Sequence, residues 1–208
     1  MYVFLDYDGT LVKTREEEFT RVYFMELAKK AGEDPKKLGN LVMGIIEDMM
    51  KNQTGEKDLF HQFVETIASR SSKSQSYWID LFFDFYKNDF EKLREFVEPN
   101  DELLESIKAS GKKFIFASNP IFPEIAVVKR LSFIGLKPED FIYVAHMENS
   151  HFMKPHPGFF KEILDKINTD PERCVFIGDS DFDKACEKVG IEFIHVEERE
   201  RWKKLLNE

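Results

Sequence analysis

The chain begins with two carboxylates whose spacing suits shared chemistry. In the opening sequence MYVFLDYDGTLV, a short apolar run leads into Asp6 and Asp8. Gly9 and Thr10 follow directly. In an extended segment alternate side chains share a side, so Asp6 and Asp8 are expected to face one way while Tyr7 faces the other. Two like charges this close repel each other, and the pair therefore predicts a cation or a shared acid–base task.

Further polar residues follow apolar, strand-like segments later in the chain. Ser118 and Asn119 come directly after KFIFA, and Lys154 lies in the loop FMKPHPGFF. Asp179 and Asp183 belong to IGDSDFD, which follows the apolar run CVF. In open parallel sheets, ligands bind beyond the carboxyl ends of the strands. We therefore expect these residues to meet the first two carboxylates at one edge of a sheet.

The second half of the chain predicts the elements that hold this edge. Short apolar segments alternate with amphipathic ones, a pattern typical of a parallel sheet covered by helices on both faces. Strands are predicted at 112–118, 141–145, 173–179 and 192–196, and helices at 100–110, 121–135, 156–167, 180–190 and 197–208. With the opening strand, they define an α/β core made from both ends of the chain.

Between the opening strand and this core, the sequence predicts only helices. Apolar residues recur at spacings of three and four in 15–32, 35–51, 56–70 and 74–97. We therefore predict a core domain at 1–13 and 97–208 and an all-helical domain at 14–96. The many aromatic residues of the helical domain have the spacing of helix-packing residues, which favours packing over a pocket for an aromatic substrate.

Composition restricts the partners and the location. The 208 residues carry a net charge of −9, which disfavours nucleic acid as a partner. The longest apolar runs fall far short of the roughly 20 residues that cross a bilayer, so no membrane span is expected. No basic leader precedes the first strand, and we expect a cytoplasmic protein. Cys174 and Cys186 lack metal-site spacing and are predicted to be buried and reduced.

The order of these motifs resembles that of the haloacid dehalogenase superfamily. The matching features are Asp-x-Asp-Gly-Thr, a hydroxyl residue with Asn after a strand, Lys-Pro, and Gly-Asp-x-x-x-Asp. The helical segment after the first motif is similar to the helical cap of that superfamily. The resemblance extends over nearly the whole core, and it implies a Rossmann-like parallel sheet with an inserted all-helical cap.

The resemblance also implies a division of roles. Asp6 would be the nucleophile that forms an aspartyl phosphate, and Asp8 would be the general acid and then the base. A Mg²⁺ ion would be held by a carboxylate oxygen of Asp6, the backbone carbonyl of Asp8 and a carboxylate oxygen of Asp179. Ser118 would bind a phosphoryl oxygen, and Lys154 would neutralise the charge that nucleophile and phosphate share.

Four more residues receive supporting roles from the same resemblance. Asn119, Gly9 and Thr10 are expected beside the substrate, where Asn119 either contacts it or orients its loop. Gly9 is also expected to relieve backbone crowding at its turn. Asp183 is expected to order metal-bound water or Lys154. His146, His151 and His156 flank Lys154 without the spacing of a known zinc site, and they are interpreted as local loop residues.

Asp8 decides between branches of the superfamily. In the dehalogenase and phosphonate-cleaving branches the residue at this position is not an acid, whereas phosphatases and phosphomutases resemble this sequence in having Asp there. A halide leaving group needs no proton, but an alkoxide does. We therefore predict a Mg²⁺-dependent phosphomonoester hydrolase for a small phosphorylated metabolite. A sugar phosphomutase is an alternative, although the basic, hydroxyl-rich cap loop of those enzymes has no match here. A non-catalytic phosphate-binding protein is another, and a monomer and a homodimer both stay open.

Overall fold

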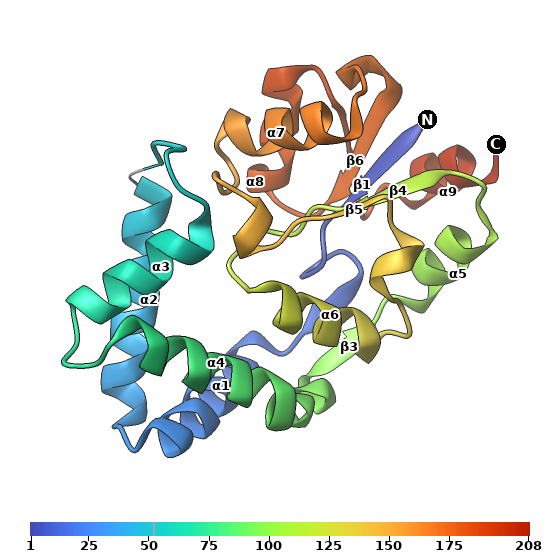
Figure 1. Cartoon of the computed structure of the whole chain (residues 1–208). Helices are drawn as coiled ribbons and strands as arrows, with labels where there is room; N and C mark the ends of the chain where they lie inside the picture. Colours follow the sequence, from blue (N-terminus) through green and yellow to red (C-terminus); the bar gives the residue numbers. More distant parts are fainter. Residues whose placement is uncertain (52) are drawn as a thin grey trace.

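A five-stranded parallel sheet forms the centre of the computed structural model, which describes residues 1–51 and 53–208 (Figure 1). The strand order is β5-β4-β1-β6-β7, and each neighbouring pair is parallel. The strands are β1 (Tyr2–Leu5), β4 (Lys113–Phe116), β5 (Tyr143–Val144), β6 (Cys174–Gly178) and β7 (Glu192–His195). Leu5 pairs with Phe116 on one side and Ile177 on the other, so the residues that follow these three strands meet at one edge.

Both faces of the sheet are buried because its central strands are apolar on both sides. Val3 and Leu5 pack into one cluster with α5, α6 and α9, whereas Phe4 packs into a second cluster with α7. Figure 1 shows α5 and α6 on one side of the sheet and α7 and α8 on the other. These helices are α5 (Asp101–Ala109), α6 (Glu124–Phe133), α7 (Pro157–Ile167), α8 (Asp181–Lys184) and α9 (Arg199–Asn207). The predicted α/β class is confirmed.

In the part of the chain that the structure describes, four helices are inserted between two short antiparallel strands. The strands are β2 (Val12–Thr14) and β3 (Val97–Pro99), and they bring the two ends of the insertion together. The inserted helices are α1 (Glu16–Ala31), α2 (Pro35–Lys51), α3 (Leu59–Ser69) and α4 (Gln75–Asn88). We call these helices and the loops between them the cap, which occupies the left and lower part of Figure 1. The predicted helical insertion is therefore confirmed, and the domain limits 14–96 stay a prediction.

Three local features differ from the sequence prediction. The helix predicted at 74–97 ends at Asn88 and gives way to the 3₁₀ helix η1, and the helix predicted at 180–190 divides into α8 and η5. In the first case, burial of Phe90 and Leu93 overrides the helical spacing of the segment. The strands β2 and β3 were not predicted, because three residues are too few to show an alternating pattern. The 3₁₀ helices are η1 (Phe90–Phe96), η2 (Pro138–Asp140), η3 (Met147–Asn149), η4 (Pro171–Arg173) and η5 (Ala185–Val189).

Two expectations from composition can be compared with the structure. Cys174 and Cys186 are buried free thiols, as predicted. Within the described residues, no helix combines the length and the apolar character needed to cross a bilayer.

An aromatic cluster joins the cap to the core. The ring of Phe90, at the end of the insertion, stacks on Phe133 of α6 with centroids 5.8 Å apart. It also lies edge-on to Tyr86 of α4, with ring centroids 5.1 Å apart, and tilted against Phe122 in the loop before α6, with centroids 6.1 Å apart. Aromatic pairs of this geometry add to the gain from burial. Phe90 therefore fixes the cap against the core.

We expect Phe90→Ala to lower the free energy of unfolding by about 3–5 kcal/mol, because it leaves a cavity where the cap meets the core. Phe83→Ala, at a 37% exposed position in α4, is the matched control and should cost less than about 1 kcal/mol. Urea denaturation followed by circular dichroism measures both. Equal losses in the two variants would contradict the assigned role of Phe90.

Candidate active site

The centre of the site is a buried lysine between two carboxylates. Lys154 Nζ donates to Asp6 Oδ1 at 2.8 Å and also to Asp183 Oδ1. Lys154 is 2% exposed, and Asp6 and Asp183 are buried as well. Asp6 directly follows β1, and its N–H donates to Ile177 O of β6 at 3.2 Å. Residues predicted from three distant motifs thus form one ion-pair network.

Burial and charge act in opposite directions on this network. Burial raises the pKa of Asp6 to about 7, even though the Lys154 ammonium opposes the shift. Burial would lower the pKa of Lys154, but Asp6 and Asp183 outweigh it and the pKa is raised. The lysine therefore stays charged beside the proposed nucleophile.

The loop that carries Lys154 is tied to the loop after β4. The backbone N–H of Lys154 donates to Asn119 Oδ1 at 3.1 Å. This bond is compatible with the loop-orienting role, one of the two predicted for Asn119, and both roles stay predictions. Ser118 is buried and follows Ala117, whose N–H donates to the carbonyl of Leu5 at 2.9 Å. The residue order thus places Ser118 at the same edge as Asp6.

Three carboxylates gather next to this lysine. Asp6, Asp179 and Asp183 each offer an oxygen atom, and these atoms lie within 4.8 Å of one another. Asp183 Oδ2 accepts bonds from the backbone N–H groups of Asp179 and Ser180, both at 3.2 Å, and from Ser180 Oγ at 2.8 Å. Burial, and then the charge of Asp183, raise the pKa of Asp179. Clustered oxygen ligands of this kind suit a hard divalent cation.

Two glycines allow these carboxylates to approach the backbone. A Cβ atom at Gly9 would lie 1.9 Å from Asp179 Oδ2, and one at Gly178 would lie 2.6 Å from Asp183 Oδ2. Gly9 also has a φ of +78°, which disfavours other residues. Crowding was predicted at Gly9, and the structure shows that the Asp179 side chain occupies the space that a Cβ atom would need there.

Asp8 has partners outside the lysine network. Its carboxylate is paired with the guanidinium of Arg130 and accepts a bond from Thr14 Oγ1 at 2.8 Å. Strand β1 ends at Leu5, so the extended-strand argument for Asp6 and Asp8 does not hold beyond that point. Partial burial would raise the pKa of Asp8, but Arg130 outweighs it and the pKa is lowered.

Arg130 was not predicted as a site residue. It lies on α6 with its side chain buried, and its guanidinium carbon is 4.1 Å from the ring centroid of Tyr7 and 4.9 Å from that of Phe122. The Tyr7 hydroxyl also donates to Arg130 O at 2.7 Å. The available signal was its position at helical spacing among Ala126, Val127 and Leu131, because a charged residue on an apolar helix face needs a partner.

Thr10 presents an unused polar group beside the site. Its Oγ1 is buried and has no hydrogen-bond partner among the residues that the structure describes. Its carbonyl accepts a bond from Asn100 Nδ2 at 2.9 Å, which connects the first motif to the end of the insertion. The predicted contact of Thr10 with substrate stays a prediction.

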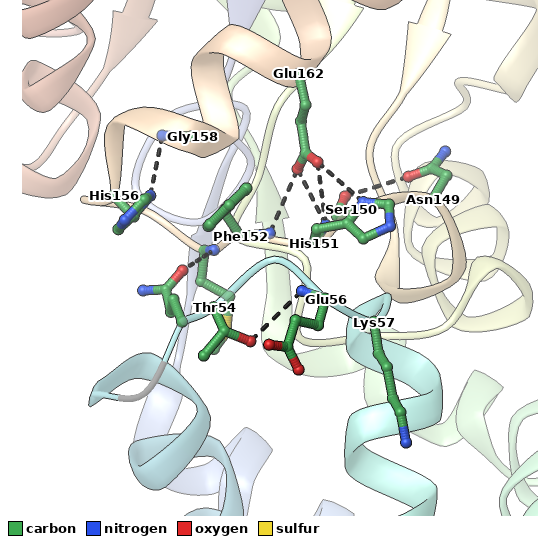
Figure 2. A network of polar contacts seen from close by, with 12 residues as sticks. Thr54, Glu56, Lys57, Asn149, Ser150, His151, Phe152, His156, Gly158 and Glu162 are labelled. Atoms are coloured by element: carbon green, nitrogen blue, oxygen red, sulfur yellow. Dashed lines mark hydrogen bonds and ion pairs between the residues drawn. The ribbon is translucent and has the colours of Figure 1, made fainter.

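A cap loop packs on the segment that leads into Lys154. Gln53 Oε1 accepts from the N–H of Met153 at 2.6 Å, and Leu59 N donates to Ser150 O at 2.9 Å. Figure 2 shows this cap loop next to the segment from Asn149 to Phe152. The cap therefore contacts the core directly beside a predicted catalytic residue.

The histidines near Lys154 have local roles. Glu162 of α7 accepts bonds from the backbone N–H groups of His151 and Phe152 (Figure 2). His156 accepts from Gly158 N at 3.0 Å, and its ring stacks on Phe152 at 4.5 Å. The acidic cluster described above is the one group of possible metal ligands found in residues 1–51 and 53–208, and it contains no histidine.

Comparison with known proteins assigns the family. The model of the haloacid dehalogenase-like hydrolases matches residues 1–185, so the chain belongs to this family, as the motifs predicted. A search of curated proteins found no match.

Solved structures share the fold at low identity. A 2-haloacid dehalogenase from Pseudomonas syringae is 20% identical with a TM-score of 0.59, over 93% of this chain and 85% of that one. A predicted phosphoglycolate phosphatase from Haemophilus somnus is 21% identical with a TM-score of 0.57, over 93% and 84%. A family enzyme from Bacteroides thetaiotaomicron, in complex with magnesium and inorganic phosphate, is 18% identical with a TM-score of 0.54, over 93% and 92%. The chain is thus a hydrolase of this family by sequence, with neighbours of more than one activity.

We expect Gly9→Ala to weaken Mg²⁺ binding about tenfold or more, because the added Cβ displaces Asp179. Gly32→Ala is the matched control, since Gly32 has a φ of +68° and open space around its Cβ position. Both variants carry backbone strain of about 1–2 kcal/mol, but only the first disturbs a carboxylate of the cluster. Calorimetric titration with MgCl₂ measures the difference, and equal affinities would contradict it.

Proposed function

We propose that the protein is a Mg²⁺-dependent phosphomonoester hydrolase that acts on a small phosphorylated metabolite. The supporting observation is the combination of Asp6, paired with a buried lysine, and a second carboxyl group at Asp8. Displacement of a halide needs no proton donor, whereas release of an alkoxide does. Since the structural neighbours include both a dehalogenase and a phosphatase, Asp8 carries the preference for phosphate esters.

Asp6 serves as the nucleophile in this proposal. One of its carboxylate oxygens attacks the phosphorus atom, a bond forms to give the aspartyl phosphate, and the bond from phosphorus to the ester oxygen breaks. Lys154, bonded to Asp6 Oδ1, neutralises negative charge on the carboxylate and the phosphoryl group. Asp183 also binds the lysine, which favours its predicted role of ordering Lys154 over that of ordering metal-bound water.

Asp8 moves the protons. It gives one to the departing ester oxygen and takes one from the water that hydrolyses the aspartyl phosphate. The ion pair with Arg130 favours the carboxylate form, which is the form that accepts the proton in the second step. The proton for the first step is the one that Asp8 took from water in the previous turnover, and in the first turnover it comes from the substrate monoanion. Asp8 then gives it to the leaving oxygen in place of its contact with Arg130.

The residues present fit a magnesium ion. The cluster sets three carboxylates, buried Asp6 and Asp183 and exposed Asp179, against one lysine, and Gly9 leaves room for Asp179. Asp6, Asp179 and the backbone carbonyl of Asp8 would hold the ion, which would supply positive charge next to the phosphoryl oxygens. The Bacteroides thetaiotaomicron neighbour was solved with magnesium and inorganic phosphate.

The remaining expectations follow from charge and composition. A net charge of −9 disfavours nucleic acid as a partner, and we expect a small-molecule phosphate ester as the substrate. We place the protein in the cytoplasm, without a membrane partner, as a monomer or a homodimer.

We expect Asp6→Asn to reduce phosphate release by at least about a thousandfold, because an amide is not a comparable nucleophile. The assay is phosphate release from a panel of small phosphomonoesters, with Mg²⁺ and with chelator. Asp181→Asn, at an exposed position close to the same edge, is the control and should retain activity. Unchanged turnover in Asp6→Asn would refute the mechanism.

We expect Asp8→Asn to slow hydrolysis of alkyl phosphates about 10²- to 10⁴-fold, the usual contribution of a general acid. Its effect on 4-nitrophenyl phosphate should be at least tenfold smaller while aspartyl-phosphate formation limits the rate, because that leaving group departs without a proton. Pre-steady-state measurement of alcohol release isolates this step. Equal losses on both esters would argue against Asp8 as the acid.

A further inference from the structure

A cavity of about 180 Å³ lies where the cap faces the core. Side chains from α1, α2, α3 and α4 surround it, together with Ile121, Phe122, Pro123 and Met147 from the core. Its lining is aromatic and aliphatic, and none of the lining side chains in the described chain is charged. The surface is therefore suited to an apolar group.

The polar atoms of this lining are almost all occupied. The hydroxyl groups of Tyr23 and Tyr86 hydrogen-bond each other at 2.8 Å, and both residues are buried. Thr20, which is exposed, is the remaining lining residue with a polar side chain among the described residues. A sugar placed here would leave several hydroxyl groups without partners, at a cost of about 1–3 kcal/mol each.

The cavity differs from a packing void because solvent reaches its lining. Met43 is 46% exposed, and Thr20 is also exposed. Voids inside a well-packed helical domain are few and closed. The sequence predicted packing roles for the cap aromatics, and several of them also form the wall of this opening.

One wall of the cavity follows a loop of the candidate active site in the chain. Ile121 N donates to the carbonyl of Asn119 at 2.8 Å, so this wall begins two residues after the loop that contacts Lys154. The ring of Phe122 lies against the Arg130 guanidinium, whose partner is Asp8. Asp8 is the proposed proton donor to the leaving oxygen, and these contacts lead from it through Arg130 and Phe122 to the cavity.

We propose that this cavity binds the organic part of the substrate, and that the substrate is a phosphate monoester of an apolar alcohol or phenol. The inference rests on the proposed phosphatase function. A cavity of roughly 150 Å³ accommodates benzene, so an apolar body of about six carbon atoms fits. Phosphorylated sugars and nucleotides are poorer substrates, because their polar groups would find few hydrogen-bond partners in this lining.

The test compares kcat/KM of the Mg²⁺-loaded full chain for n-alkyl phosphates from methyl to octyl, phenyl phosphate and glycerol 3-phosphate. We expect a gain of about threefold to fourfold for each added methylene, which levels off near six carbons. Propyl phosphate should exceed glycerol 3-phosphate at least tenfold. A flat series, or a preference for glycerol 3-phosphate, would overturn the inference and leave the phosphatase function standing.

A matched pair of variants locates the effect. Met43→Trp places a large ring at the cavity and should flatten the dependence on chain length. Met25→Trp is the control, because Met25 is 47% exposed on α1 and does not line the cavity. An unchanged chain-length dependence in Met43→Trp would overturn the assignment of this cavity.

Binding of phenol separates the two possible failures. This neutral aromatic probe should bind Asp6→Asn, measured by calorimetric titration, and bind Asp6→Asn/Met43→Trp at least tenfold more weakly. Absence of binding would overturn the cavity as an apolar site, whatever the enzyme hydrolyses. No turnover of any ester, with phenol still bound, would overturn the phosphatase function and the ester assignment together.

Discussion

The ion pairs of Lys154 with Asp6 and Asp183 constrain the rest of the site. A charged amine that is 2% exposed is tolerated in a protein interior only when carboxylates pair with it. Removing one partner of such a pair typically costs about 3–5 kcal/mol, because the other charge stays buried. The parallel register meets this requirement, because it brings the ends of β1 and β6 to the same edge as the Lys154 loop.

The arrangement leaves an excess of negative charge. Asp179 joins the two paired carboxylates, and the backbone approaches it so closely that only glycine fits at Gly9. Crowding of this kind is unfavourable for an acidic cluster alone, and it fits the proposed binding of a divalent cation.

The segment from Asn119 to Arg130 couples the reaction centre to the cap. Asn119 holds the Lys154 loop, Phe122 lines the apolar cavity, and Arg130 binds Asp8. Phe122 also packs against Phe90 at the end of the insertion, so the position of the cap and the position of Asp8 depend on one stretch of chain. In the proposed mechanism, this connection places the binding of the organic part of the substrate next to the residue that transfers protons.

The sequence by itself determined the α/β class, the helical insertion, and the motif residues that form the edge, because periodicity and motif order are local properties. Lys154, Asp6 and Asp183 could be predicted as one group, since parallel strands end at one edge. Arg130 could not be recognised as the partner of Asp8, because 122 positions separate them along the chain. The break at Asp89 and the cavity among the cap helices likewise depend on packing between distant segments. Only the tertiary structure decides such contacts, because side-chain pairing and shape complementarity arise when the elements pack.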